Sequence, residues 1–263
     1  MNGSSSTRKS EQVALLVTCL SDLFRPQIAH AAVELIEKFG YRVDVPKQTC
    51  CGQPAYNAGE EGKTRILAES MISLFEPYRY VIAPSGSCAA TIKEHYPGLF
   101  HEGSSRHGQC MRLVEKTHEL SGFLVDVVKA DLEQKKSSFD DGPLRIAYHD
   151  SCSGLRELGI RSQPRKLLKD RLGIDISEMS NAEGCCGFGG MFCVKYPEIS
   201  TSMVDSKIDG IEDAEAEVLL GGDLGCLMNI AGRLRRLGSK TRVYHYAEFL
   251  TDSGPGPAIG YRK

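Results

Sequence analysis

Eight of the ten cysteines in this chain fall into two sets with nearly the same spacing. A lone cysteine precedes a vicinal pair by 31 residues in the first set and by 33 in the second, and a trailing cysteine follows the pair by 37 and 40 residues. Each pair is followed directly by glycine, in "TCCGQ" and "GCCGF". Agreement in order and in both intervals indicates an internal duplication. The sets are Cys19, Cys50, Cys51 and Cys88, called the first quartet, and Cys152, Cys185, Cys186 and Cys226, called the second quartet.

Short apolar runs alternate with helical patterns in both halves. The segment 26–40 places Ile28, Ala32, Leu35 and Phe39 on one helical face and ends at a glycine. Strands alternating with helices predict parallel βαβ units, and so an α/β fold of two similar halves, each a mostly parallel sheet with flanking helices. Further helices are predicted at 62–78, 88–96, 115–134, 163–173, 197–214 and 226–238, and strands at 13–19, 41–45, 79–88, 144–152, 174–179 and 216–226.

The domain organisation follows from the repeat. We expect a first cysteine-rich half over 11–135 and a second over 144–263. The polar stretch 136–143, "KSSFDDGP", is predicted to be the linker, and residues 1–10 a disordered tail.

The cysteines follow strand ends, and this placement predicts that each quartet converges. Loops leaving the carboxyl ends of parallel strands gather at one edge of the sheet. Four thiolates satisfy a tetrahedral zinc ion or anchor one iron–sulfur cluster. The C-x-x-C knuckles common in structural zinc sites do not occur in this sequence. Glycine N–H groups beside the pairs can donate to sulfur, and helices opening at the trailing cysteines favour a negatively charged group.

Composition excludes several other classes of function. A net charge of −2 gives no basis for a nucleic-acid partner. The apolar run 13–20 is too short for a transmembrane segment and lacks the flanks of a signal peptide, so we expect a cytoplasmic protein, in which cysteines stay reduced. No carboxylate pair, Ser/His/Asp set or nucleotide-binding glycine spacing stands out, and no catalytic residue is predicted.

Two residues outside the quartets are additional candidate ligands. His149 stands three positions before Cys152 and fits three roles: metal ligand, hydrogen-bond donor to a cluster sulfur, or strand-end histidine bonded to backbone. Cys193 is close enough to the second pair to substitute as a ligand, although it and Cys110 are also interpreted as buried or incidental thiols.

The segments "YHDSCSGLRELGI", "GCCGFGGMF" and "APSGSC" resemble a known family. The doubled C…CCG…C pattern is similar to the CCG cysteine-rich domain found in heterodisulfide reductase and in the iron–sulfur subunits of enzymes that oxidise glycolate and glycerol 3-phosphate. The likeness is strongest to the LutA/YkgE family of lactate utilization proteins and runs from about Cys19 to His245. It implies an iron–sulfur electron-transfer subunit of a complex that converts L-lactate to pyruvate, working with a ferredoxin-like iron–sulfur protein and a third subunit.

The sequence departs from the fullest form of the CCG motif at two positions. That form has another cysteine three residues before the last, where this chain has Ser85 and Asp223. With four cysteines, a [4Fe-4S] cluster in each half and a single metal ion both fit. The alternative function is a zinc-stabilised scaffold or interaction module without redox activity, with zinc in one or both sites. The prediction that the substrate is lactate, rather than glycolate or another 2-hydroxy acid, rests on the resemblance alone.

Overall fold

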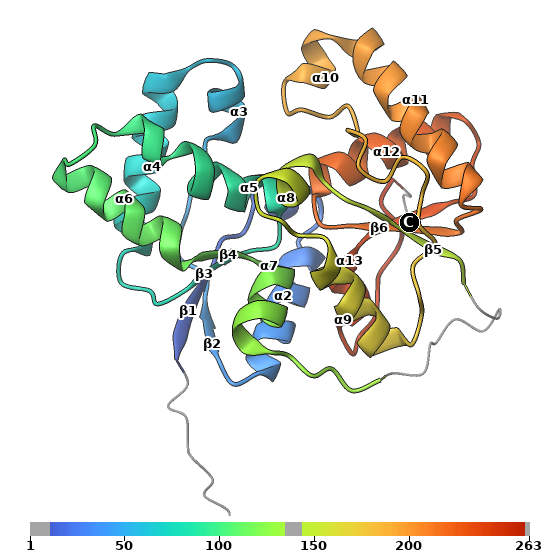
Figure 1. Cartoon of the computed structure of the whole chain (residues 1–263), viewed down its shortest axis with the longest axis horizontal. Helices are drawn as coiled ribbons and strands as arrows, with labels where there is room; N and C mark the ends of the chain where they lie inside the picture. Colours follow the sequence, from blue (N-terminus) through green and yellow to red (C-terminus); the bar gives the residue numbers. More distant parts are fainter. Residues whose placement is uncertain (1–10, 135–143, 261–263) are drawn as a thin grey trace, which may run out of the picture.

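Helices and short parallel strands alternate through both halves of the chain, as Figure 1 shows. The computed structural model describes residues 11–134 and 144–260. The predicted tail at 1–10 and the predicted linker at 136–143 lie outside the described residues, and the domain boundaries remain a prediction. No helix in the described part of the chain is both long and apolar enough to cross a membrane.

The first half contains β1 (Gln12–Leu15), α1 (Cys19–Phe24), α2 (Gln27–Lys38), β2 (Arg42–Asp44), α3 (Gln53–Asn57), α4 (Glu61–Phe75), β3 (Val81–Ala83), α5 (Gly86–Ala90), π-helical η1 (Thr91–His95), 3-10 helical η2 (Pro97–Leu99), α6 (Ser105–Lys116), β4 (Thr117–Glu119), α7 (Leu120–Gly122) and π-helical η3 (Phe123–Val128). The second half contains β5 (Ile146–His149), α8 (Cys152–Arg156), α9 (Ser162–Leu172), α10 (Phe192–Lys195), α11 (Pro197–Asp213), β6 (Val218–Gly221), α12 (Leu224–Arg236), β7 (Arg242–His245) and α13 (Tyr246–Leu250).

The strands form two parallel sheets within the described residues. The first has the order β2–β1–β3–β4 and the second β5–β6–β7. Every pairing is parallel, with Val13 opposite Val43 in the first sheet and His149 opposite Gly221 in the second. The order β1–β3–β4 is therefore repeated by β5–β6–β7, and the predicted α/β fold of two similar halves is confirmed.

Alternation along the strands gives each sheet one face toward a common core and one face toward its own helices. In β1 and the residue that follows it, Ala14 and Leu16 pack with α4, α5 and α6, whereas Val13 and Leu15 face the common core. In the second sheet, Leu219 packs with α11 and α12.

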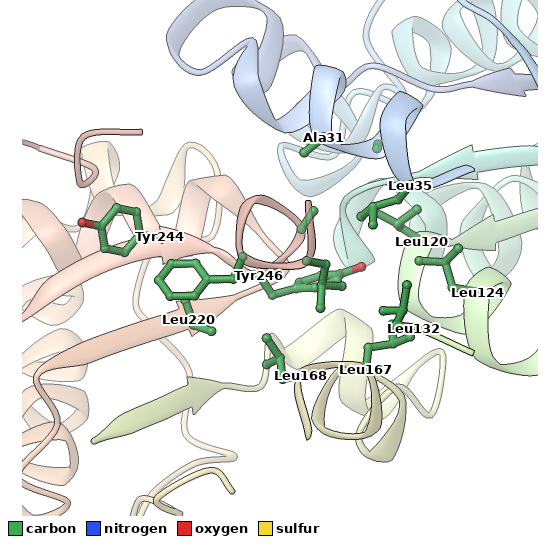
Figure 2. Packing of buried hydrophobic residues seen from close by; sticks show 14 of the residues in the cluster. Ala31, Leu35, Leu120, Leu124, Leu132, Leu167, Leu168, Leu220, Tyr244 and Tyr246 are labelled. Atoms are coloured by element: carbon green, nitrogen blue, oxygen red, sulfur yellow. The ribbon is translucent and has the colours of Figure 1, made fainter. Parts of the chain in front are cut away.

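The common core joins the two halves. Figure 2 shows Leu35 of α2 and Leu120 of α7 in one cluster with Leu167 of α9 and Tyr246 of α13. The core is continuous because α13 packs on α2, and α9 on α7. An ion pair between Arg25 and Glu248 at 2.9 Å reinforces this contact.

Two predicted elements are wrong. Within the segment expected to be helical at 115–134, Thr117–Glu119 forms β4, because it pairs with β3 and completes the sheet. The strand expected at 174–179 is not formed. A single bond from Ser177 N–H to the Ile146 carbonyl replaces a ladder, and the acidic side chains of Asp175 and Glu178 bind Lys169 and Arg165 of α9 instead.

Candidate metal centre

The first quartet is assembled from two helix N-termini and one loop. Cys19 opens α1 behind its N-cap Thr18, and Cys88 lies in the first turn of α5. Cys50 and Cys51 lie in the loop between β2 and α3. The Sγ atoms of Cys19 and Cys50 are 3.8 Å apart, and those of Cys51 and Cys88 are 3.4 Å apart. Cys50 also interacts with its neighbour Cys51, so the four sulfurs, scattered over the first half in sequence, form one contiguous group.

The second quartet repeats this construction. Cys152 opens α8 behind its N-cap Ser151, and Cys226 lies in the first turn of α12. The thiol of Cys185 interacts with those of Cys152 and Cys186, and the Sγ atoms of Cys186 and Cys226 lie within 4.8 Å of each other. The second set of four sulfurs is thus contiguous as well, and all ten cysteines of the chain are free thiols.

A glycine after each pair turns its N–H group onto a sulfur. Gly52 has φ +87° and Gly187 φ +78°, a conformation that glycine adopts at low cost. Each N–H donates to the Sγ of the first cysteine of its pair at 3.4 Å, Cys50 and Cys185 respectively. The glycine of the CCG sequence therefore has a direct role in binding sulfur.

Hydrogen bonding concentrates negative charge on the first cysteine of each pair. Cys19 and then Cys51 donate to Cys50 and hold the pKa of its thiol well below the ordinary range. The cysteine donors take the opposite shift, so the bond to Cys50 raises the pKa of Cys19. The pKa of Cys185 is lowered in the same way, first by Cys152. Each quartet thus favours a thiolate, the form that binds metals.

Both quartets line one cavity of about 290 Å³ between the halves. The sequence predicted one site in each half, and the tertiary structure brings the two sites face to face. Phe188 and Met191, which follow the second pair, form part of the wall beside the sulfurs. Polar side chains lining the cavity are Thr18, Gln53, Ser85, Ser87, Ser151, Ser153 and Asp223.

The halves meet beside this cavity at equivalent positions of the repeat. Ser85 Oγ donates to Asp223 Oδ1 at 2.7 Å, and Ser87 donates to the same carboxylate through N–H at 3.0 Å and Oγ at 2.6 Å. A Cβ on Gly86 would lie 2.9 Å from the Cα of Gly154, so α5 and α8 need glycine at their closest approach. The positions lacking the extra motif cysteines thus connect the two halves.

Two buried basic residues lie beside the second quartet. His149 is 1% exposed, and burial, aided by the charge of Lys207, lowers its pKa to about 3. Lys207 of α11 is also 1% exposed and donates to the carbonyls of Asn181 and Ala182, in the loop that leads to Cys185. Burial lowers the pKa of Lys207, an effect that the nearby Cys186 opposes.

Comparison with known proteins follows the same two halves. A model of the CCG cysteine-rich domain matches residues 13–93 and 146–231. Lactate utilization protein A of Geobacillus kaustophilus (strain HTA426) is 48% identical over 240 residues, which cover 91% of this chain and 98% of that protein. Lactate utilization protein A 2 of Bacillus cereus (strain 03BB102) is 44% identical over 241 residues, covering 91% and 97%. The chain belongs to the lactate utilization protein A family.

The family resemblance seen in the motifs is therefore confirmed, as is the presence of two CCG domains in this member of the lactate utilization protein A family. A solved structure of a proposed Asp/Glu racemase from Yersinia pestis aligns with 90% of this chain and 94% of its own, at 9% identity and a TM-score of 0.35. That value is too low to inform on fold or function.

The remaining cysteines of this lactate utilization protein A family member lie outside the quartets. Cys110 of α6 is fully buried in the core, and burial raises its pKa to about 11. Cys193 of α10 donates to the Gly190 carbonyl at 3.3 Å. Neither is among the residues that line the cavity.

Sequence reasoning missed Lys207 and the contact between Ser85 and Asp223. Lys207 carried a detectable signal, because it stands on the face of α11 that buries Val204, Ile208 and Ile211. A lysine at such a position needs local compensation. The contact at Asp223 had no such signal, since it depends on how the halves pack.

Proposed function

We propose that this chain is an iron–sulfur electron-transfer subunit of an L-lactate-oxidising complex, with one cluster of the [4Fe-4S] type in each quartet. The observation that carries the proposal is the contiguity of the four sulfurs in each half, which are brought together from segments far apart in sequence. A purely apolar role for these cysteines would not need them to converge twice with the same pattern.

The donor set fits a soft, negatively charged group. Thiolates select iron–sulfur clusters, zinc or copper(I) over hard ions. The N–H groups of Gly52 and Gly187 aim at Cys50 and Cys185, as expected where backbone donors tune a metal–thiolate group. The α12 N-terminus adds a favourable dipole beside Cys226. Bound iron–sulfur clusters would supply one-electron transfer, and the protein's part is to hold them and to set their potentials.

Lactate oxidation is proposed for the complex rather than for this chain. Support comes from the relatives, which are named lactate utilization protein A. We infer that the partners are a ferredoxin-like iron–sulfur protein and a third subunit, and that the chain works in the cytoplasm, where thiols stay reduced. The shared cavity supports direct electron exchange between the two sites, because both quartets line it.

Anaerobic purification tests the assignment of the metal group. We expect brown protein with broad absorption at about 400 nm that bleaches with dithionite, and with bound iron and sulfide. Cys50→Ser and Cys185→Ser should each lose about half of the iron, since each removes one ligand of one quartet. Cys193→Ser is the control and should keep all of it. Colourless protein with stoichiometric zinc would overturn the proposal in favour of a zinc-stabilised scaffold.

A second measurement tests the link to lactate. Mixed anaerobically with its two partner subunits, the oxidised protein should bleach on addition of L-lactate and release pyruvate. The Cys185→Ser chain should slow pyruvate formation in the same mixture. Clusters that respond to glycolate and stay oxidised with L-lactate would contradict the substrate while leaving electron transfer intact.

A further inference from the structure

The buried imidazole ring of His149 has no hydrogen-bond partner among the described residues. Both Nδ1 and Nε2 are without a partner, and the residue is 1% exposed. Buried polar atoms are almost always paired, since an unpaired group has lost its hydrogen bonds to water without gaining others in their place. The carboxylate of the adjacent Asp150 accepts two bonds from Arg165 at 2.8 Å and makes none with the His149 ring. The imidazole therefore lacks a partner that the protein alone supplies.

The ring lies beside two sulfurs of the second quartet. A nitrogen of His149 and the Sγ atoms of Cys186 and Cys226 all lie within 4.8 Å of one another. Bonds of about 2.0–2.3 Å bring two ligand atoms of one tetrahedral ion to about 3.5–4 Å, so small side-chain movements suffice to share a metal. The backbone of His149 is fixed by its pairing with Gly221 across β5 and β6.

The first half has no counterpart of this donor. Leu16 stands three positions before Cys19, as His149 does before Cys152. Leu16 is 1% exposed and packs in the apolar cluster with Cys51 and Cys88. The two halves thus match in their cysteines and differ in a nitrogen donor.

We propose that His149 is a fifth protein donor of the second site, binding through an imidazole nitrogen the metal centre, single ion or cluster, to which Cys186 and Cys226 also belong as ligands. This inference rests on one part of the proposed function, namely that the second quartet binds a metal. A neutral imidazole brings less negative charge than a thiolate, and histidine ligation raises the potential of iron–sulfur centres. The second site therefore accepts electrons before the first.

Cobalt(II) alone is the probe, because it binds thiolate and imidazole sites without cluster assembly. Metal-free protein carrying Cys50→Ser and Cys51→Ser retains only the second quartet. Cobalt bound there should show an imidazole shell in X-ray absorption. The matched control carries Cys185→Ser and Cys186→Ser, retains only the first quartet, and should show sulfur without imidazole. Adding His149→Leu, the residue found at position 16, should remove the imidazole shell and weaken cobalt binding by about 10- to 100-fold.

A second quartet that binds cobalt without nitrogen, or an imidazole shell that survives His149→Leu, would overturn the inference. If the serine variants do not fold, the same spectra of the unaltered chain and of His149→Leu decide by their difference in nitrogen count. Failure of the iron–sulfur assignment is distinguishable, because cobalt ligation is measured without iron. If the protein binds iron but its cobalt form shows no imidazole ligand, the iron–sulfur assignment stands and His149 is not a ligand.

Discussion

The first cysteine quartet lies among apolar side chains, whereas the second lies beside buried basic ones. The buried faces of α4 and α11 align position by position and locate the difference. Thr64 corresponds to Ser200, Ala68 to Val204, Met71 to Lys207, Ile72 to Ile208, and Phe75 to Ile211. Of these pairs, only Met71 and Lys207 differ in charge. Leu16 and His149 form a second unequal pair.

The difference indicates that the duplicated sites have kept their sulfur geometry and diverged in electrostatics. No carboxylate among the described residues lies within ion-pair distance of Lys207 Nζ, which is bonded to two carbonyls. A buried ammonium is costly unless negative charge lies nearby. The second quartet supplies such charge when it holds a metal–thiolate group. The second site is therefore better suited to a reduced, more negative group than the first.

The glycines after the cysteine pairs give the largest expected contrast between the halves. A Cβ on Gly187 would lie 2.6 Å from the Ser200 carbonyl oxygen, whereas a Cβ on Gly52 would meet only side-chain carbons at 3.5 Å. Gly187→Ala should lower the free energy of unfolding by about 3 kcal/mol, from a strained backbone plus the clash. Gly52→Ala should cost about 1 kcal/mol, from backbone strain alone. Urea denaturation of both variants measures this, and equal losses would contradict the contrast.

The residues capping the helix after the last strand of each sheet should give opposite pH dependences. His245 caps α13, bonds the Pro84 carbonyl at 3.2 Å, and burial lowers its pKa to about 4 from 6.5. The unfolded chain then binds the proton first, so stability is lost as pH falls from about 6.5 to 4, by up to about 1.4 kcal/mol per pH unit. Glu119 caps α7, and burial raises its pKa above 4.5, so its contribution is lost as pH rises above that value.

Unfolding free energies measured from pH 4 to pH 7 test both signs. His245→Gln should flatten the acid-side slope, and Glu119→Gln should flatten the slope above about pH 4.5. The readout is the change in slope, which a uniform loss of stability does not produce. An unchanged acid-side slope in His245→Gln would show that another group causes the acid sensitivity.

The contact at Asp223 should show that equivalent positions of the repeat depend on each other. Asp223→Ala removes three bonds to one carboxylate and should cost about 2 kcal/mol, whereas Ser85→Ala should cost about 1 kcal/mol. The double variant should lose less than the sum, because the two residues share a bond. Additive losses in urea denaturation would mean that the contact contributes nothing of its own.

Lys207→Met, which installs the first-half residue, should have the smallest effect in energy. Removing the buried charge should lower the reduction potential of the second site, on the order of 50 mV, because the reduced state loses a favourable Coulomb interaction. Redox titration followed by electron paramagnetic resonance measures this. Lys207→Arg should leave the reduction potential of the second site nearly unchanged. The reduction potential of the first site should not shift in either variant. A shift of both sites together would indicate a structural effect instead.

Local signals explain which parts of the fold could be predicted. The amphipathic pattern at 26–40 predicted α2 to within two residues at each end, because helical periodicity is a property of the segment itself. The helix predicted at 197–214 is found as α11. The short strand β4 was missed since three residues carry no alternation, and its pairing with β3 alone makes it a strand.

The spacing of the cysteines by itself determined that the chain is a duplication and that each half gathers four sulfurs, because strand ends of a parallel sheet meet at one edge. Only the tertiary structure decided that the two quartets share a cavity, that Ser85 bonds Asp223, and that Lys207 is buried beside the second quartet. The reason is physical. The positions of residues within one half follow from the lengths of its helices and strands and from how its strands pair. The position of one half relative to the other depends on the close fit of two surfaces, as at Gly86 and Gly154.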